Sequence, residues 1–553
     1  MNKQHKRYIF IGAAWPYANA PLHLGHIASL LPADIIARYY RLKGDNVLFV
    51  SGSDCHGTPI VLAAEKEKKS PDEIAQFYHK EFKKTLIDSF DFSYDNYTTT
   101  LTENHTKVVQ EFFTKLYEKK DIEIKKQKLP FCSNCQRFLP DRYIEGKCPK
   151  CGFESARGDQ CDQCGQMLDP EDLIDPKCQI CNSTPIFKET EHFFLKLSQK
   201  EKFIKDLVNS SSGWRKNAIG FTNKLLNEGL KDRAITRDTS WGVDIPLGGY
   251  ENKKIYVWFD AVCGYYSASL EALNKTDELG KYWENSEARH YYVHGKDNIP
   301  FHTIIWPIML KGFGNLKLPD YIVSSEYLTL ENKQFSKSRD WAIWAKDITC
   351  DFDSDYLRFY LILNGPETSD SDFDFYDFQS RINSELIGNF GNFINRTTQL
   401  IERNFKNGIE INQKSQYLQT IEEIFESTGK LIEEGNLREA LKQVLKIAED
   451  GNKYLSQQEP WKKIKDHPQS AQNILANCAK AIICLQTLIS PFLPKSSQKI
   501  ANIFDNNNRS TWQYPDQEKF LVKKTEIIFQ KIEKEQIEAQ ITKLKGGTEN
   551  KQV

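Results

Sequence analysis

The chain has 553 residues, with 74 Lys and Arg against 75 Asp and Glu, which gives a formal net charge of -1. One hydrophobic core stops growing at about 250–300 residues, so the length predicts two or more domains. The near-zero net charge excludes a basic field over the whole surface, so any nucleic-acid partner must be bound by a local basic surface. The N-terminus has no secretory pattern and no segment reaches the ~20 apolar residues of a membrane span, so we expect a cytoplasmic protein without membrane contact.

The first segments alternate between strand and helix patterns. Arg7–Ile11 is typical of a strand and Ala13–Leu22 of an extended loop. A fresh helix is expected to begin at Pro32, because proline fits the first helical turn, and to end at Gly44. Asn46–Val50 is the next apolar strand. This order predicts an α/β domain with a parallel sheet.

The rest of the chain changes character twice. Residues 121–189 are rich in Cys, Pro, Gly and Asp, which predicts a small inserted domain organised by metal. Strands are then expected at Ile255–Phe259, Tyr291–His294 and Tyr321–Val323. From about residue 380 long helical patterns such as Ile421–Glu434 and Leu437–Tyr454 predict an all-α helix bundle.

Eight of the 13 cysteines form four Cys-x-x-Cys pairs. Two such pairs complete a tetrahedral Cys₄ site, so the spacing predicts two zinc ions with a structural role. Spacing alone leaves two pairings open, one nested and one sequential along the chain. The pairs are Cys132/Cys135, Cys148/Cys151, Cys161/Cys164 and Cys178/Cys181.

The segment His23-Leu24-Gly25-His26 follows the first expected strand and opens a helix. It places two imidazoles one turn apart at a helix N-terminus, where free N–H groups and the helix dipole favour phosphate. Gly25 leaves the backbone bare, so that a flat ring can lie against it. An isolated tetrapeptide of this kind arises often by chance.

A second short sequence, Gln334–Ser338, lies far downstream and is followed by Arg339. Its Lys337 among small polar residues suits a mobile loop that closes on a polyphosphate. Together the two sequences resemble the HIGH and KMSKS signatures of class I aminoacyl-tRNA synthetases, in the expected order around an insert. Coincidence is then a poor explanation.

Further segments resemble the methionyl-tRNA synthetase family over nearly the whole chain: Ala14–Asn19, Asp54–Pro59, Tyr256–Ala261, Gly295–Asn298 with Phe301–His302, and Glu459–Trp461. This resemblance implies a Rossmann-like parallel-sheet catalytic domain with an inserted zinc-knuckle connective domain, followed by a helix bundle. It implies catalytic halves at 1–120 and 236–325, the insert at 121–235, a KMSKS and stem-contact region at 326–379, an anticodon-binding domain at 380–535 and a tail at 536–553.

The resemblance implies that the enzyme activates methionine with ATP and loads it onto tRNA(Met). Asp54 is expected to pair with the α-ammonium group, and the hydroxyl of Tyr17 with His302 to face the weakly accepting sulfur. For Trp258 and Tyr265, core packing is the alternative on sequence alone. The expected methionine-binding residues are Ala14, Trp15, Tyr17, Asp54, Trp258, Ala261, Tyr265 and His302.

For ATP, the resemblance implies that His23 and His26 contact the triphosphate and that Asp297 binds the ribose hydroxyls. Lys337 is expected to stabilise charge while the methionine carboxylate attacks the α-phosphorus, with magnesium accompanying ATP. The expected catalytic residues are therefore His23, His26 and Lys337. The expected ATP-binding residues are His23, Gly25, His26, Asp297, Lys337 and Ser338.

Several positions depart from the family pattern. The first lysine of KMSKS is Gln334 here and its methionine is Phe335, while Lys333 lies one place early. Whether Lys333 substitutes for the missing lysine stays open. Trp15 stands where leucine is frequent, and Val262 replaces a proline of some relatives.

The family pattern also implies that Cys148, Cys151, Cys161 and Cys164 share one zinc and that the outer pairs share the other.

In the helical domain, Asn392, Arg396 and Trp461 match positions that contact the CAU anticodon, where bases stack on aromatic rings and form hydrogen bonds through their edges. A solvated helix face is the alternative for these side chains. We expect a monomer.

Two other functions compete with this hypothesis. A different class I synthetase is disfavoured because the insert is too short for an editing domain and the cysteines come in complete sets, without an open metal position. A non-catalytic, zinc-organised RNA-binding protein is disfavoured by the intact His23, His26, Asp54, Asp297 and Lys337.

Overall fold

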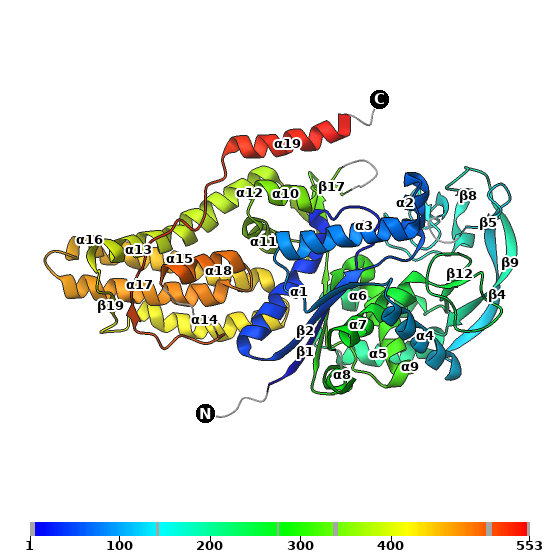
Figure 1. Ribbon diagram of the computed structural model, residues 1–553, viewed down its shortest axis with the longest axis horizontal. Helices are drawn as coiled ribbons and strands as arrows, with labels where there is room; N and C mark the ends of the chain where they lie inside the picture. The colour runs from blue at the N-terminus through cyan, green and yellow to red at the C-terminus, as the bar shows by residue number, and fades with distance from the viewer. Residues whose placement is uncertain (1–5, 140–142, 274–275, 336–340, 505–510, 550–553) are drawn as a thin grey trace.

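The computed structural model describes residues 6–139, 143–273, 276–335, 341–504 and 511–549. A parallel sheet with its flanking helices and a cysteine-rich insert forms one half of the molecule, and a helix bundle forms the other (Figure 1). The predicted combination of a Rossmann-like sheet, a knuckle insert and an all-α domain is confirmed.

The central sheet has six strands in the order β10-β15-β14-β1-β2-β3, and all five pairings are parallel. Alternate residues of β1 enter two different cores, since Ile9 and Ile11 lie on one face and Phe10 lies on the other. A parallel sheet is stable when both faces are covered in this way. The strands are β1 (Tyr8–Ala13), β2 (Asn46–Ser53), β3 (Asn96–Thr99), β10 (Gly213–Trp214), β14 (Arg289–Gly295) and β15 (Tyr321–Ser325).

Helix α1 (Leu24–Lys43) follows β1 and ends at Gly44, whose φ of 83° gives the expected left-handed cap. The expected fresh start at Pro32 is wrong, because α1 runs through that residue without a break. Proline removes one backbone hydrogen bond, but the buried neighbours Leu31 and Ile35 hold the helix against the sheet.

The expected strand at Ile255–Phe259 is also wrong. Only Lys254–Ile255 is a strand (β13), and helix α7 (Val257–Leu273) begins two residues later. Short apolar runs fit a strand or a buried helix equally well, and here the helix places Trp258, Ala261 and Tyr265 on one face. The other helices around the sheet are α2 (Thr58–Glu67), α3 (Pro71–Lys83), α4 (Glu103–Glu118), α8 (Thr276–Trp283) and α9 (Trp306–Gly314).

The cysteine-rich insert contains more regular structure than its sequence indicated. A long antiparallel ribbon joins β4 (Ile122–Cys132) to β9 (Ile186–Leu195), and the knuckles lie at its far end. After β9 come α5 (Glu201–Ser210) and α6 (Lys216–Glu228), and β10, which lies between these two helices, joins the central sheet. Within the knuckles lie β5 (Arg137–Phe138), β6 (Ile144–Lys147), β7 (Ala156–Arg157) and β8 (Ile174–Cys178).

A small sheet of β16 (Leu328–Leu330), β17 (Lys333–Gln334) and β18 (Ser371–Phe373) follows the main sheet. Two helices, α10 (Ala345–Asp351) and α11 (Ser354–Leu363), lead on to the helical half. None of the described helices is long and apolar enough to cross a membrane. The helical half contains α12 (Phe375–Arg381), α13 (Asn392–Asn404), α14 (Gln416–Glu433), α15 (Leu437–Gln458), α16 (Pro460–Lys463), α17 (Pro468–Ile489), α18 (Pro494–Ile503) and the terminal α19 (Lys534–Glu549).

Glu433, at the end of α14, joins the helical half to the sheet. Its carboxylate accepts hydrogen bonds from Tyr39 at 2.9 Å, Lys43 at 2.8 Å and Arg289 at 2.7 Å. Burial alone would raise the pKa of Glu433, but Lys43, Arg289 and Tyr39 outweigh it and lower the pKa from 4.5 to about 2. A depressed carboxyl pKa means that this contact stabilises the folded protein at neutral pH.

We expect Glu433→Gln to lower the stability at pH 7 by roughly 2–3 kcal/mol, because Lys43 and Arg289 lose their counter-charge. The wild-type advantage should be complete above pH 4.5 and should disappear as pH falls toward about 2. Melting curves between pH 7 and pH 3 measure this. Glu434→Gln, at the exposed neighbouring position, is the control. A gap between wild type and E433Q that stays constant over this range would contradict the assignment.

Candidate functional site

The site lies beside two neighbouring parallel strands, β1 and β14, from which the chain continues toward opposite sides of the sheet. Strand β1 pairs with β2 on one side and with β14 on the other, so the connection order reverses between β1 and β14. Parallel α/β sheets bind ligands outside the carboxyl ends of their strands at such a point. His23 follows β1, Asp54 follows β2 and Asp297 follows β14, which brings all three to this edge.

The two histidines of the first motif lie in contact at the start of α1. Their ring centroids are 3.9 Å apart, and the backbone N–H of His23 donates to Nδ1 of His26 at 3.1 Å. His23 is the residue that caps the helix, so both imidazoles lie beside the first N–H groups of α1. This arrangement suits an anionic ligand.

The downstream motif reaches the same place. The ring of Phe335 stacks on the ring of His23, with centroids 4.8 Å apart and planes 2° from parallel. The chain beyond the loop is also attached, because Leu24 N–H donates to Ile343 O at 3.0 Å and Ala345 N–H to Leu22 O at 2.8 Å. Lys337 and Ser338 lie outside the described residues. The structure thus brings the flanks of both motifs together.

Two glycines fix the position of Trp15 beside β2. A Cβ atom on Gly52 would lie 2.5 Å from the Trp15 ring, and one on Gly264 would lie 2.7 Å from it. Both residues must therefore lack a side chain for the indole to lie between strand and helix. Ala14 is held by its N–H, which donates to Val293 O at 2.9 Å.

Aromatic side chains of α7 and of the turn after β14 pack ring against ring. Trp258 stacks on Phe301 with centroids 4.0 Å apart, and Tyr17 meets Trp258 edge-on at 5.8 Å. Trp258 is half-buried, whereas Tyr265 is fully buried. Ala261 lies between them on the same helix face, so the expected pocket residues of α7 share one wall.

His302 is held as a neutral imidazole. Its Nδ1 donates to Asn298 O at 2.8 Å, so its Nε2 must accept, and the Tyr265 hydroxyl lies 2.7 Å from that atom. Burial lowers the pKa of His302 to about 4. The hydroxyl paired with His302 is therefore that of Tyr265. Contact of either residue, or of Tyr17, with a sulfur atom stays a prediction.

Asp54 is a buried carboxylate without a cationic partner among the described residues. It is 1% exposed and accepts a hydrogen bond from the backbone N–H of His56 at 3.2 Å. Burial, with a further contribution from Asp260, raises the pKa of Asp54 well above its ordinary value. A buried acid of this kind is suited to a ligand that brings its own positive charge.

Behind Asp54 lies a buried chain of polar side chains that sequence analysis did not assign. Asp260 accepts from Nδ1 of His56 at 2.6 Å and from Nε2 of His105 at 2.5 Å. Burial would raise the pKa of Asp260, but the two histidines lower it to about 2. His105 continues to the Ser267 hydroxyl at 2.8 Å. Asp260 belongs to the quoted Tyr256–Ala261 segment, whereas His105 had no signal in the sequence.

The three expected RNA-contacting side chains also lie together, at the end of the bundle. Asn392 and Arg396 are one turn apart on α13, and the Arg396 guanidinium lies 5.6 Å from the centroid of the Trp461 ring. Trp461 is 39% exposed, which is unusual for so large an apolar ring. This cluster therefore offers a stacking face and hydrogen-bond donors to solvent.

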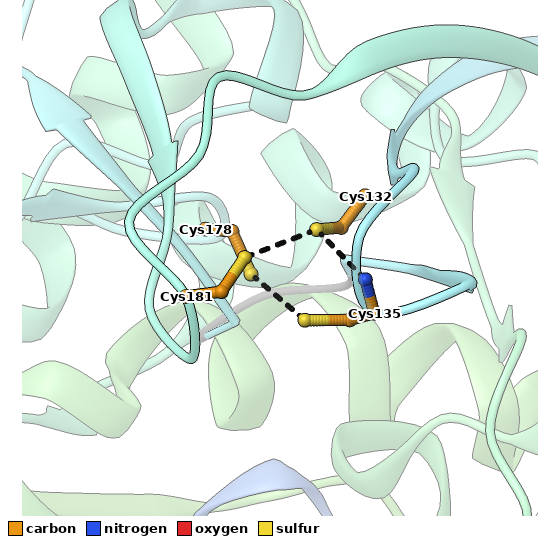
Figure 2. A group of neighbouring side chains, drawn as sticks. All are labelled: Cys132, Cys135, Cys178 and Cys181. Atoms are coloured by element: carbon orange, nitrogen blue, oxygen red, sulfur yellow. Dashed lines mark hydrogen bonds between the residues drawn. The ribbon is translucent and has the colours of Figure 1, made fainter.

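The eight knuckle cysteines form two separate groups of four, and none is in a disulfide. Cys132 and Cys135 meet Cys178 and Cys181, with Sγ–Sγ distances of 3.4 Å and 3.9 Å across the pairs (Figure 2). The inner group is Cys148, Cys151, Cys161 and Cys164, with distances of 4.0 Å and 3.6 Å.

These distances fit a tetrahedral metal site. A Zn–S bond of about 2.3 Å places tetrahedral ligands about 3.8 Å apart, and all ligand atoms of each group lie within 4.8 Å of one another. The nested pairing is the one found, and the sequential alternative is excluded. Each group could hold one zinc ion.

Comparisons with known proteins agree over the whole length. Residues 9–398 match the family model described as tRNA synthetases class I (M), and residues 406–549 match the anticodon binding domain of methionyl tRNA ligase. The chain is 46% identical over 541 residues to a methionine–tRNA ligase of Streptococcus pneumoniae, covering 97% of this chain and 98% of that protein. A methionine–tRNA ligase of Bacillus cereus is 46% identical over 547 residues, or 98% and 99% of the two chains.

The fold agrees with a solved structure. A crystal structure of Mycobacterium tuberculosis methionyl-tRNA synthetase bound by methionyl-adenylate has a TM-score of 0.79 and 20% identity, covering 95% of this chain and all of that one. The sheet, the two motifs and the family model define a class I aminoacyl-tRNA synthetase. Within that class, the chain belongs to the methionine–tRNA ligase family.

We expect Cys161→Ser to reduce the bound zinc from about two ions per chain to about one, because three thiolates hold the ion far less tightly than four. Metal analysis of the purified protein by mass spectrometry measures this. Cys350→Ser, at an exposed cysteine outside both groups, should leave the content unchanged. Wild-type protein without zinc, or equal losses in both variants, would contradict the assignment.

Proposed function

We propose that the site joins methionine to ATP, releases pyrophosphate, and transfers the methionyl group from the adenylate to tRNA(Met). The observation that carries this proposal is the contact of His23 with Phe335 at the sheet edge that also holds the buried Asp54, which has no cationic partner within the described part of the chain. One edge of the sheet then carries a helix N-terminus that can bind an anion, the residue that flanks the loop, and an acceptor for an ammonium group.

In the first step, the methionine carboxylate oxygen attacks the α-phosphorus of ATP, and pyrophosphate leaves with the electron pair of the broken P–O bond. His23 and His26 bind the triphosphate, and Lys337 stabilises the charge that builds up on it. Asp54 holds the α-ammonium group. Catalysis is then positioning and electrostatic stabilisation, without a covalent bond to the protein.

The side-chain pocket is formed by Tyr17, Trp258 and Ala261 with the Tyr265–His302 pair. Because His302 is neutral and hydrogen-bonded on both nitrogens, it presents no full charge to an apolar thioether. Aromatic walls suit the polarizable sulfur. Ala14 and Trp15 complete the pocket next to β1.

Ions and partners complete the proposal. Magnesium neutralises charge on the ATP phosphates when bound. Each group of four thiolates would hold one zinc ion, and the bound ion would stabilise the fold of its knuckle. Asn392, Arg396 and Trp461 read the unstacked anticodon bases. The enzyme works as a cytoplasmic monomer.

Methionine-dependent exchange of labelled pyrophosphate into ATP tests the first step, and strong exchange with a different amino acid instead would reject it. We expect His23→Ala to lower kcat for this exchange about 100-fold, the typical effect of removing one preorganised donor. His467→Ala, at an exposed histidine before α17, should retain wild-type exchange. If H23A remains fully active, the first motif is not catalytic.

We expect Asp260→Asn to raise the KM for methionine roughly 10-fold while the KM for ATP stays within about 2-fold, because losing a charged hydrogen bond to His56 releases the backbone that holds Asp54. Asp238→Asn is the matched control, since Asp238 accepts a hydrogen bond at 3.0 Å from His192, a buried histidine of the insert. Equal increases in both KM values would instead mean a general loss of structure.

A further inference from the structure

Asp297 lies at the surface, in the turn Lys296–Asn298 that follows β14. An exposed aspartate on a short turn samples several rotamers unless a neighbour fixes it. In this structure the hydroxyl of Tyr327 donates to Oδ1 of Asp297.

The backbone of Tyr327 is bound on both sides. Its N–H donates to the Asp370 carboxylate at 2.9 Å, and its carbonyl accepts from Ser371 N–H at 3.0 Å. Tyr327 directly precedes β16, and its carbonyl bond with Ser371 lies next to the first pair of the β16–β18 ladder. The main chain at Tyr327 is therefore held at the end of this small sheet.

The ring of Tyr327 is fixed by a cation. Nζ of Lys296 lies 3.8 Å from the ring centroid, and the same atom binds Glu326 at 2.9 Å and Asp370 at 2.7 Å. A lysine shared between two carboxylates and an aromatic face loses much of its freedom. Lys296 and Asp297 are adjacent, so one turn contributes both the clamp on the ring and the acceptor of its hydroxyl.

We propose that Tyr327 is a positioning residue that orients Asp297 toward the ribose hydroxyls of ATP. This inference rests on the proposed function, in which Asp297 binds the ribose. Burial and the neighbouring Asp297 raise the pKa of the Tyr327 hydroxyl, so it stays a protonated donor throughout the physiological range. Its hydrogen bond to a carboxylate is charge-assisted and hence directional.

The position of Tyr327 in the chain extends its effect to the loop. Strand β16 pairs with β17, and β17 leads directly to Phe335, which stacks on His23. The acid expected at the ribose, the strand before the loop and the histidine expected at the triphosphate are thus connected by direct contacts. A shift of Asp297 on nucleotide binding would be transmitted through Tyr327 to the base of the β16–β17 hairpin.

Tyr327→Phe tests the proposal, because it removes the hydroxyl and keeps the ring under Lys296. We expect the KM for ATP in methionine-dependent pyrophosphate exchange to rise about 10-fold, with kcat and the KM for methionine within about 2-fold of wild type. Tyr376→Phe, at a tyrosine that is 50% exposed, should behave as wild type.

A second measurement excludes a merely structural role. Wild-type enzyme should use 2′-deoxy-ATP less efficiently than ATP in kcat/KM, and Y327F should lose most of this preference, because its Asp297 is no longer aimed at the diol. An unchanged preference together with an unchanged KM for ATP would overturn the proposal. An increase in the KM for ATP with the full preference retained would also overturn it.

The outcomes separate this inference from the proposed function. If wild-type enzyme shows no methionine-dependent exchange, the proposed function fails before Tyr327 is tested. If Y327F melts at a much lower temperature than wild type, Asp370→Asn provides the alternative, because it loosens both Lys296 and the backbone of Tyr327 while keeping the hydroxyl. D370N should then show a smaller loss of the ribose preference, and no loss at all would refute the positioning role.

Discussion

The parallel pairing of β1 with both β2 and β14 is the constraint on which the site depends. Parallel strands end at one edge of the sheet, so residues from distant parts of the sequence are delivered to a common line. This register brings His23, Asp54 and Asp297 to one edge of the sheet. The strands are buried on both faces, with Ile9 and Phe10 in separate cores, which leaves little freedom for the edge to shift.

The helical half is joined to the same strands by buried charge. Arg358 of α11 is fully buried and binds Asp34 of α1 at 2.7 Å, and it also donates to Phe492 O, in the turn between α17 and α18, at 2.7 Å. Glu433 makes the corresponding contacts from α14 to α1 and β14. The Arg358–Asp34 pair tolerates little displacement, because separating two buried charges is costly. These contacts join the bundle, which carries Trp461, to the helix that begins after His23.

Sequence analysis found the elements whose patterns are local. The strand Tyr291–His294, the helix ending at Gly44 and the four cysteine pairs each have a signal within a few residues, and all are present. It failed where tertiary packing overrides the pattern, as at Pro32 within α1 and at Val257, where an apolar run of strand-forming residues begins a helix.

The candidate site was accessible to sequence reasoning only through motifs. Spacing could not pair the cysteines, and the family pattern supplied the nested arrangement that the structure contains. His105 and Tyr327 were missed because each acts through another residue, Asp260 or Asp297, that is far away in the sequence. No local pattern encodes a contact between residues separated by 30 or 155 positions.

Aromatic contacts hold the flanks of the altered loop motif. Nζ of Lys333 lies 5.0 Å from the centroid of the Trp341 ring, a cation–π contact that joins the two flanks of the loop across its base. This contact holds the Lys333 side chain at the base of the hairpin in this structure. Phe335, in the place of the usual methionine, adds a stacked contact with His23. In this chain the loop is therefore attached to the first motif through aromatic rings, and Lys337 is left as the expected source of positive charge.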